Sequence, residues 1–312
     1  MKFIQEFFEG CRVSGIYLCK HKQAAVTKNG KPYENVILQD KTGTIDAKIW
    51  DLNNGIAHFD AMDYISVIAQ VVSFQGNLQL NVKQVRKAQE GEYHVADYMP
   101  CSSFNIDDMY KELTDLMKSV KDKYLNRLLQ NIFINDKEFA EKFKNHSAAK
   151  SIHHGFIGGL LQHTLAVAKL CDYYSLQYPI LNRDLLITAA ICHDIGKVDE
   201  LSEFPENDYT DEGQLIGHIV MGTMLLDGKM KEIEGFPVKL ANELKHCILA
   251  HHGELEYGSP KKPALAEAMA LNLADNADAK MQTLTELFKD KKGNDWLGYN
   301  RLFESNIRKT VI

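Results

Sequence analysis

The apolar residues of this chain change their spacing near residue 105, and this change constrains the fold more than any other feature. Before it, short runs rich in Val, Ile, Tyr and Phe are separated by turn-forming residues, which is typical of β-strands. In residues 44–50, Ile45, Ala47 and Ile49 alternate with polar neighbours, as in a half-buried strand. The runs that predict strands are Arg12–Cys19, Tyr33–Gln39, Thr44–Trp50, Tyr64–Phe74 and Asn77–Arg86.

Five short strands within about ninety residues predict a small closed barrel, and an oligonucleotide-binding (OB) barrel has this strand count. Beyond residue 105 the spacing becomes helical, with patterns at residues 160–176, 184–197, 213–228, 238–251 and 264–288. We therefore expect a multidomain α+β protein. It would comprise an OB-like β-barrel at 1–90, a linker with connecting helices at 91–149, an all-α helical bundle at 150–288 and a C-terminal tail at 289–312.

Bulk properties restrict the environment and the partners. A length of 312 residues favours two domains, and no apolar run is long enough to cross a bilayer. The N-terminal residues MKFIQEFFEG contain acidic side chains where a secretory signal would be apolar, so we expect a cytoplasmic protein. The net charge of −6 argues against a protein that coats nucleic acid through bulk charge. The first ninety residues nevertheless hold 11 Lys/Arg against 9 Asp/Glu, so an anion-binding surface is expected there.

Histidine is concentrated in the predicted bundle, where nine of the twelve histidines lie between residues 146 and 252. Imidazole and carboxylate groups together suit divalent transition ions, and a bound ion lowers the pKa of its water enough to supply hydroxide near neutral pH. Separate helices that converge on a bundle core could bring distant ligands together. The candidate ligands are His163, His193, Asp194, His218, His251, His252 and Asp275.

Each of these residues also has a structural explanation. A histidine on an apolar helix is more often a hydrogen-bonded core residue than a ligand. That explanation is weakest for His193 and Asp194, because the segment 185–195 is otherwise almost wholly apolar and a buried polar pair is costly without a partner.

Three further residues lie near these candidates in the sequence. Lys197 lies one turn further on and could meet a phosphate oxygen, or could simply be solvated. His154 precedes Gly158-Gly159, and a substrate contact there is an open alternative. Asp278, three residues after Asp275, is expected either behind the ligands or as an ordinary exposed residue.

The order of these residues resembles the H…HD…D signature of HD-superfamily phosphohydrolases, over about residues 150–280. The additional histidines and the lysine of HDIGK resemble the fuller pattern of binuclear HD-GYP-type members, although no GYP tripeptide is present. The resemblance implies two ions bridged by Asp194. The first would also take His163, His193 and Asp275, and the second would also take His218, His251 and His252.

OB barrels bind single strands with a mildly basic groove and aromatic platforms for the bases. Trp50 is the best single candidate, because it falls on the polar phase of its strand. Aromatic residues in strands are more often core residues, and lysines are more often solubilising. The candidate contacts are Tyr33, Trp50, Phe74, Lys22, Lys48, Lys83 and Arg86.

Taken whole, the order of barrel, helical linker and HD domain resembles the YhaM family of bacterial 3′-5′ exoribonucleases. The stretches ENVILQDKTGTIDAKIWD, GNLQLNVKQVR and HHGFIGGLLQHTLAVA carry this resemblance. It implies dependence on Mn²⁺ or Co²⁺, removal of nucleotides from the 3′ end of single-stranded RNA, and activity on single-stranded DNA.

Three functions remain as hypotheses. The favoured one is a metal-dependent 3′-5′ exoribonuclease that releases nucleoside 5′-monophosphates, with Asp194, Lys197 and His154 as catalytic residues. The second is a hydrolase of small nucleotides, for which the barrel would be superfluous. The third is a single-strand-binding replication or repair accessory, which the intact ligand set disfavours. The residue pattern determines neither the native ion, nor the preference for RNA or DNA, nor the oligomeric state.

Overall fold

A computed structural model describes residues 2–27, 29–52, 54–99, 101–150, 154–289 and 295–310. The chain divides into two compact units. The barrel unit comprises Met1–Ser103 and two short segments, Phe156–Gly158 and Leu201–Tyr209. The helical unit comprises Phe104–Gly155, Gly159–Glu200 and Thr210–Ile312.

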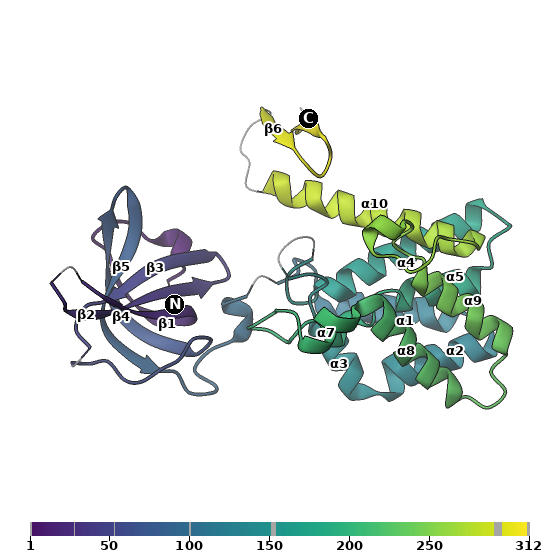
Figure 1. The fold of residues 1–312 in the computed structure, drawn as a ribbon, viewed down its shortest axis with the longest axis horizontal. Coiled ribbons are helices and arrows are strands. Elements are labelled where there is room, and N and C mark those ends of the chain that lie inside the picture. The colour runs from purple at the N-terminus through teal and green to yellow at the C-terminus, as the bar shows by residue number, and fades with distance from the viewer. Residues whose placement is uncertain are drawn as a thin grey trace. The chain divides into compact units, whose positions relative to one another are not determined.

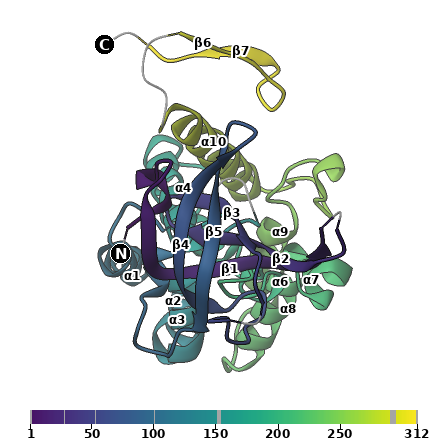
Figure 2. The ribbon, with the colours of Figure 1, turned by 90° about the vertical axis from the view of Figure 1, so that its left-hand side faces the viewer.

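The described part of the barrel unit contains a closed β-barrel in which the strands follow the order β1-β2-β3-β5-β4 (Figure 2). Neighbouring strands are antiparallel except for β3 and β5, which are parallel. The strands are β1 (Arg12–Val26), β2 (Pro32–Asp40), β3 (Gly43–Ile49), β4 (Tyr64–Phe74) and β5 (Asn77–Lys87). Short 3₁₀ helices flank them, η1 (Ile4–Glu6) and η2 (Val95–Asp97). This architecture confirms the predicted OB-like barrel.

Alternating side chains build the barrel interior. The side chains of Ile45, Ala47 and Ile49 are buried, whereas Asp46 and Lys48 between them are not. The same alternation fills the centre with aliphatic residues from β1, β2, β4 and β5. Polar side chains of these strands therefore face outward, where they can meet a ligand.

The helical unit is a bundle in which α4 packs against α5 and α10 (Figure 1). Its helices are α1 (Ile106–Ser119), α2 (Lys123–Gln130), α3 (Lys137–Asn145), α4 (Gly159–Gln177), α5 (Arg183–Cys192), α6 (Lys197–Glu200), α7 (Asp211–Ile216), α8 (His218–Lys231), α9 (Val238–Leu249) and α10 (Ala266–Lys289). A π-helical turn, η3 (Asn131–Asn135), and a 3₁₀ helix, η4 (Leu255–Tyr257), complete the bundle. The predicted all-α bundle is thereby confirmed. Among the described residues, no helix combines the length and the apolar composition that a membrane span requires.

Two predicted helices are each broken in the structure. The pattern at 184–197 predicts one helix, but α5 ends at Cys192 and a turn carries His193 and Asp194. The pattern at 213–228 is interrupted at Gly217, whose φ of 79° lies in the left-handed region that glycine favours. Both breaks leave a histidine at the end of a helix, where its side chain can turn toward the bundle core.

The C-terminal tail also differs from a plain extension. Strands β6 (Trp296–Asn300) and β7 (Ser305–Arg308) pair as an antiparallel hairpin, which the sequence pattern did not predict. Residues 290–294 and 311–312 lie outside the described part of the chain.

Candidate metal centre

Side chains from five parts of the helical unit meet around Asp194. His163 comes from the middle of α4, and Asp194 lies with His193 in the turn after α5. His218 is the first residue of α8, while His251 and His252 follow α9, and Asp275 lies in α10. Residues far apart in the sequence thus converge because α4, α5, α9 and α10 pack together.

The first set of ligand atoms lies on one side of Asp194. His163 Nε2 is 3.1 Å from His193 Nε2 and 3.2 Å from Asp275 Oδ1. Asp194 Oδ2 is 3.3 Å from His193 Nε2 and 3.5 Å from His163 Nε2. Ligands that are each about 2.0–2.2 Å from one ion lie at comparable separations from one another. The four residues implied for the first ion are therefore brought together.

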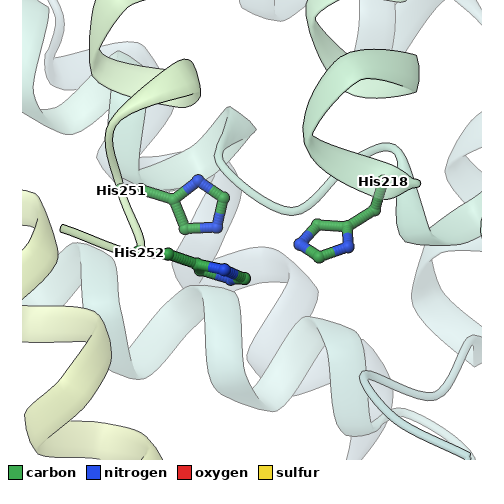
Figure 3. Close-up of side chains that lie close together, drawn as sticks. All are labelled: His218, His251 and His252. Atoms are coloured by element: carbon green, nitrogen blue, oxygen red, sulfur yellow. The ribbon is translucent and has the colours of Figure 1, made fainter. Parts of the chain in front are cut away.

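The second set faces the other carboxylate oxygen. Asp194 Oδ1 is 3.4 Å from His218 Nε2 and 3.6 Å from His251 Nε2. His218, His251 and His252 form a group whose potential ligand atoms all lie within 4.8 Å of one another. Figure 3 shows their three rings gathered around one point. The two oxygens of Asp194 thus face different sets of histidines, as a bridging carboxylate requires.

The donor atoms themselves indicate that an ion fits. Among the described residues, Asp194 Oδ1, His218 Nε2 and His251 Nε2 are buried and have no hydrogen-bond partner. Leaving buried polar atoms unsatisfied costs about 1–3 kcal/mol each, so such atoms are rare in native proteins. A divalent cation between them would satisfy all three. The mixed nitrogen and oxygen donors suit a transition ion.

The Nδ1 atoms of the candidate histidine ligands contact acceptors that surround the site. Each of five histidines places its Nδ1 within 2.7–2.9 Å of an oxygen acceptor. A proton on Nδ1 leaves the lone pair on Nε2 free for a metal, so these contacts fix the tautomer that ligation needs. The pairs are His163 with Asp278 Oδ2, His193 with the Ala190 carbonyl, His218 with Glu200 Oε1, His251 with the Ile248 carbonyl and His252 with the Tyr257 carbonyl.

Charge is concentrated in this buried site. Burial opposes ionisation of Asp194, but Lys197, whose Nζ is 2.7 Å from Asp194 Oδ2, and the nearby histidines hold the pKa of this carboxyl well below its usual range. Burial would lower the pKa of Lys197, and the Asp194 carboxylate raises it overall. Burial likewise would lower the pKa of His163, but Asp275 and Asp278 raise it to about 10, so an ion that binds Nε2 would displace a proton from it. The carboxylates are therefore ionised and ready to bind a cation.

Two glycines allow this assembly. A Cβ on Gly196, in the HDIGK segment, would lie 2.1 Å from the backbone oxygen of His218. A Cβ on Gly159 would lie 1.9 Å from the backbone oxygen of His154. Only glycine permits these approaches, so the first brings α8 close enough for His218 to reach Asp194.

The structure places the other two predicted catalytic residues differently from the metal ligands. Lys197 is largely buried and forms its ion pair with Asp194. His154 is only 2% exposed, and its Nε2 is 3.0 Å from Asp278 Oδ2. Asp278 contacts His154 and His163 with the same oxygen, so Asp278 links His154 to the candidate ligand His163.

Sequence patterns predict no role for Glu200 and leave that of Asp278 open. Asp278 lies three residues after Asp275 on α10, so helical spacing puts it on nearly the same face. Glu200 lies six residues after Asp194, at the end of α6, and no spacing rule links it to His218. Its contact depends on the tertiary approach of α7 and α8.

On the barrel, some of the predicted nucleic-acid contacts form one aromatic and basic group. The rings of Tyr33 and Trp50 stack with centroids 4.7 Å apart, and Lys48 Nζ lies 5.8 Å from the centre of the Tyr33 ring. Trp50 is 40% exposed. Phe74 is exposed next to the turn between β4 and β5, and Lys83 is exposed on β5.

Two other predicted contacts have partners within the protein. Lys22 Nζ is 3.1 Å from Glu34 Oε1 and lies over the Phe59 ring. Arg86 forms a bidentate pair with Glu92, at 2.7 and 2.8 Å. These cations are less suited to binding phosphate than Lys83, which is exposed, and than Lys48, whose Nζ donates to the neutral amide oxygen of Asn35 and has no carboxylate partner among the described residues.

The comparisons with known proteins agree with this geometry. The family model described as HD domain matches residues 160–280, which contain all seven ligand candidates. Fold and site together define an HD-domain protein with an N-terminal OB-like barrel. The chain is 33% identical over 320 residues to the 3′-5′ exoribonuclease YhaM of Geobacillus sp. (strain WCH70), a match that covers 100% of this chain and 97% of that protein. The chain therefore belongs to the YhaM family.

Two solved structures resemble part of the chain. One is a replication protein A heterotrimer bound to ssDNA, with a TM-score of 0.23 and 15% identity, covering 28% of this chain and 65% of that chain. The other is the second OB-fold domain of replication protein A from Methanococcus maripaludis, with a TM-score of 0.24 and 17% identity, covering 29% and 96%. The barrel of this protein is assigned from its own strand order.

Proposed function

We propose that this protein is a metal-dependent 3′-5′ exoribonuclease that degrades single-stranded RNA to nucleoside 5′-monophosphates. The observation that carries the proposal is the position of Asp194, whose two oxygens face two different histidine sets in a buried site. Membership of the YhaM family supports the substrate class and the direction.

The chain's own donors define the ions that we propose. Asp194 would bridge two divalent ions. When bound, such ions would lower the pKa of water so that hydroxide is available near neutral pH, and would offset the charge of the phosphoryl group. Nitrogen and carboxylate ligands favour Mn²⁺ or Co²⁺ over Ca²⁺ or Mg²⁺. His163, His193 and Asp275 would complete one site, and His218, His251 and His252 the other.

Hydrolysis adds water across the terminal phosphodiester. The oxygen of the water bonds to phosphorus and the P–O3′ bond breaks. The 3′-oxygen of the shortened strand leaves and takes up a proton. Lys197 keeps Asp194 ionised and adds a positive charge close to the site where phosphoryl charge develops. His154 would act through Asp278, which orients the ring of His163.

The barrel would hold the strand whose 3′ end is trimmed. Tyr33, Trp50 and Phe74 offer surfaces on which bases can stack, and Lys48 and Lys83 can contact phosphates. This mode of binding favours single strands over duplexes, because the bases of a duplex are already stacked. It is compatible with single-stranded DNA as a second substrate.

We also propose a cytoplasmic location. All six cysteines are free thiols, and five of them are buried, which suits a reducing compartment.

The test is a nuclease assay with 5′-labelled single-stranded RNA and DNA of the same sequence in Mn²⁺. We expect a ladder of shortening RNA and release of nucleoside 5′-monophosphates, with slower trimming of the DNA. A protein that leaves both strands intact but cleaves free nucleotides would instead be the small-nucleotide hydrolase. A protein that binds RNA and cleaves neither would be the accessory protein.

A further inference from the structure

The outer surface of the barrel is hollowed beside Trp50. The depression has a volume of about 670 Å³ and lies over β1, β4, β5 and the segment after β3. Pockets for small molecules commonly span about 300–1,000 Å³, so one nucleotide fits. The side chains that could contact a ligand in this pocket include Arg12, Trp50, Gln70, Asn81, Lys83 and Gln84.

Strand register places the polar side chains of the pocket in one row. Arg12 on β1 pairs with Gln70 on β4, and Gln70 pairs with Asn81 on β5. Asn81 also pairs with Lys48 on β3. Directly paired residues point to the same face of a sheet, so an amide-rich row connects the pocket to the cation beside Tyr33.

A β-bulge adds two further side chains. Ile68 pairs with Gln84 and Ala69 with Val82, which leaves Lys83 as an extra residue on β5. A bulge breaks the in-out alternation, so Lys83 and Gln84 are both exposed and both line the pocket.

The pocket also has a wall fixed by backbone hydrogen bonds. Val85 N donates to the Gly55 carbonyl and Ala57 N donates to the Val85 carbonyl, both at 2.9 Å. A Cβ on Gly55 would lie 3.1 Å from Cγ of Gln84, so the glycine allows this segment to lie close against β5. The depression is therefore part of the fold rather than a gap between loose side chains.

Five polar side chains of the pocket have no partner in the described part of the chain. Within the described residues, the side chains of Arg12, Gln70, Asn81, Lys83 and Gln84 form no ion pair and no hydrogen bond. Arg86 on the same strand differs, because Glu92 neutralises it. Asp51 also lines the pocket, so charge attraction there is partly offset.

Amide side chains present a donor and an acceptor side by side, which matches the edge of a nucleobase. Arg12 and Lys83 can contact the neighbouring phosphates, and Trp50, which stacks with Tyr33, borders the pocket. We propose that this pocket binds one nucleobase of the single-stranded RNA by its edge, adding base recognition to the stacking platform. The inference rests on the proposed function for its ligand class.

The experiment measures binding without hydrolysis. A Trp296→Phe variant leaves Trp50 as the only tryptophan, because the chain has two. Its fluorescence is followed in EDTA while a short single-stranded RNA is titrated at several salt concentrations. Gln70→Ala with Asn81→Ala tests the amides, Lys83→Ala tests the phosphate contact, and Gln5→Ala, an exposed amide elsewhere on the barrel unit, is the control.

We expect the double amide variant to bind RNA about tenfold more weakly with an unchanged salt slope, because hydrogen bonds to a base release no counterions. Lys83→Ala should lower the slope of log K against log salt by about 0.7. Gln5→Ala should match the parent. If the double variant melts at a lower temperature, the single variant Gln70→Ala, at an exposed position, provides the same comparison with a smaller loss.

RNA affinity of the amide variants within twofold of the parent overturns the inference. The same conclusion holds if their affinity for inorganic polyphosphate falls as much as their affinity for RNA, because base recognition does not act on polyphosphate. Failure of the proposed function gives a different pattern. In that case RNA binds and the amides matter, but metal-loaded protein yields no ladder.

Discussion

The candidate metal centre and the proposed nucleic-acid surface are built in opposite ways. The centre gathers buried histidines and aspartates from five parts of the helical unit, and their outer nitrogens are held by further partners. The barrel surface carries exposed side chains on neighbouring strands. Five polar side chains of the pocket beside Trp50 form no hydrogen bond or ion pair within the described residues, namely Arg12, Gln70, Asn81, Lys83 and Gln84. Burial fixes the side-chain positions of the metal centre, whereas the side chains of the barrel surface are open to solvent.

This difference has a consequence for substitutions. In the centre, the candidate ligands would share the same ions, so removing one ligand weakens the ion that the other buried donors need. On the barrel, each contact adds its own share of affinity and the fold does not depend on it. We therefore expect abrupt losses from the centre and graded losses from the barrel.

The largest effect should come from Asp194→Asn. An amide cannot offer two anionic oxygens to two sets of ligands, so hydrolysis of RNA should be abolished while RNA binding in EDTA is retained. Asp199→Asn, an exposed aspartate on α6, is the matched control and should keep normal turnover. Near-normal activity of Asp194→Asn would remove the bridging aspartate from the account.

Asp278→Asn should have the next largest effect. The variant loses the anionic partner of His163 Nδ1, and changes in such supporting groups lower metal affinity about 10–100-fold. Metal titration followed by metal analysis of the protein measures this directly, without reference to activity. Lys280→Gln, an exposed change on the same helix, should leave metal content unchanged. If Asp278→Asn binds as much metal as this control, the carboxylate of Asp278 does not position His163.

Trp50→Ala should reduce activity on RNA about tenfold, because stacking on an aromatic ring contributes about 1–3 kcal/mol per base. Hydrolysis of a small phosphodiester by the same variant should not change, since the metal centre is intact. Trp296→Ala, at an exposed residue of the C-terminal hairpin, is the control. Equal losses on both substrates would mean that Trp50 acts through stability and not through the strand.

The smallest effect should be that of Arg86→Gln, which we expect to change RNA affinity less than about twofold because Glu92 already neutralises the guanidinium. Lys48→Gln should weaken binding by about fivefold, the loss of one phosphate contact. Binding assays at one salt concentration compare the two. A larger loss from Arg86→Gln than from Lys48→Gln would reverse our ranking of the cations.

The same comparison explains what could be predicted from the sequence. His193 and Asp194 could be predicted as site residues because they are a polar pair in an otherwise apolar segment, which is expected to be buried. The sequence pattern does not predict the break after Cys192, which lies where the backbone of α8 closely approaches Gly196, a contact that local periodicity does not encode. On the barrel, the strands were predicted well, but the pairing of Lys22 and Arg86 with Glu34 and Glu92 depends on contacts that alternation does not encode.

The buried supporting residues show the same limit. Asp278 could be suspected from its helical spacing to Asp275, whereas the contact between Glu200 and His218 joins residues that no local pattern relates. Local periodicity therefore predicts elements and faces, while partners across the fold require the packed structure.

Trimming from a free 3′ end is the central claim, and one comparison tests it most directly. Three forms of one RNA are incubated with metal-loaded protein: linear with a free 3′-hydroxyl, linear with a bulky 3′ block, and circular. We predict that only the first is shortened stepwise, with nucleoside 5′-monophosphates as the product. Cleavage of the blocked and circular forms at the rate of the free form would identify an endonuclease and contradict the account.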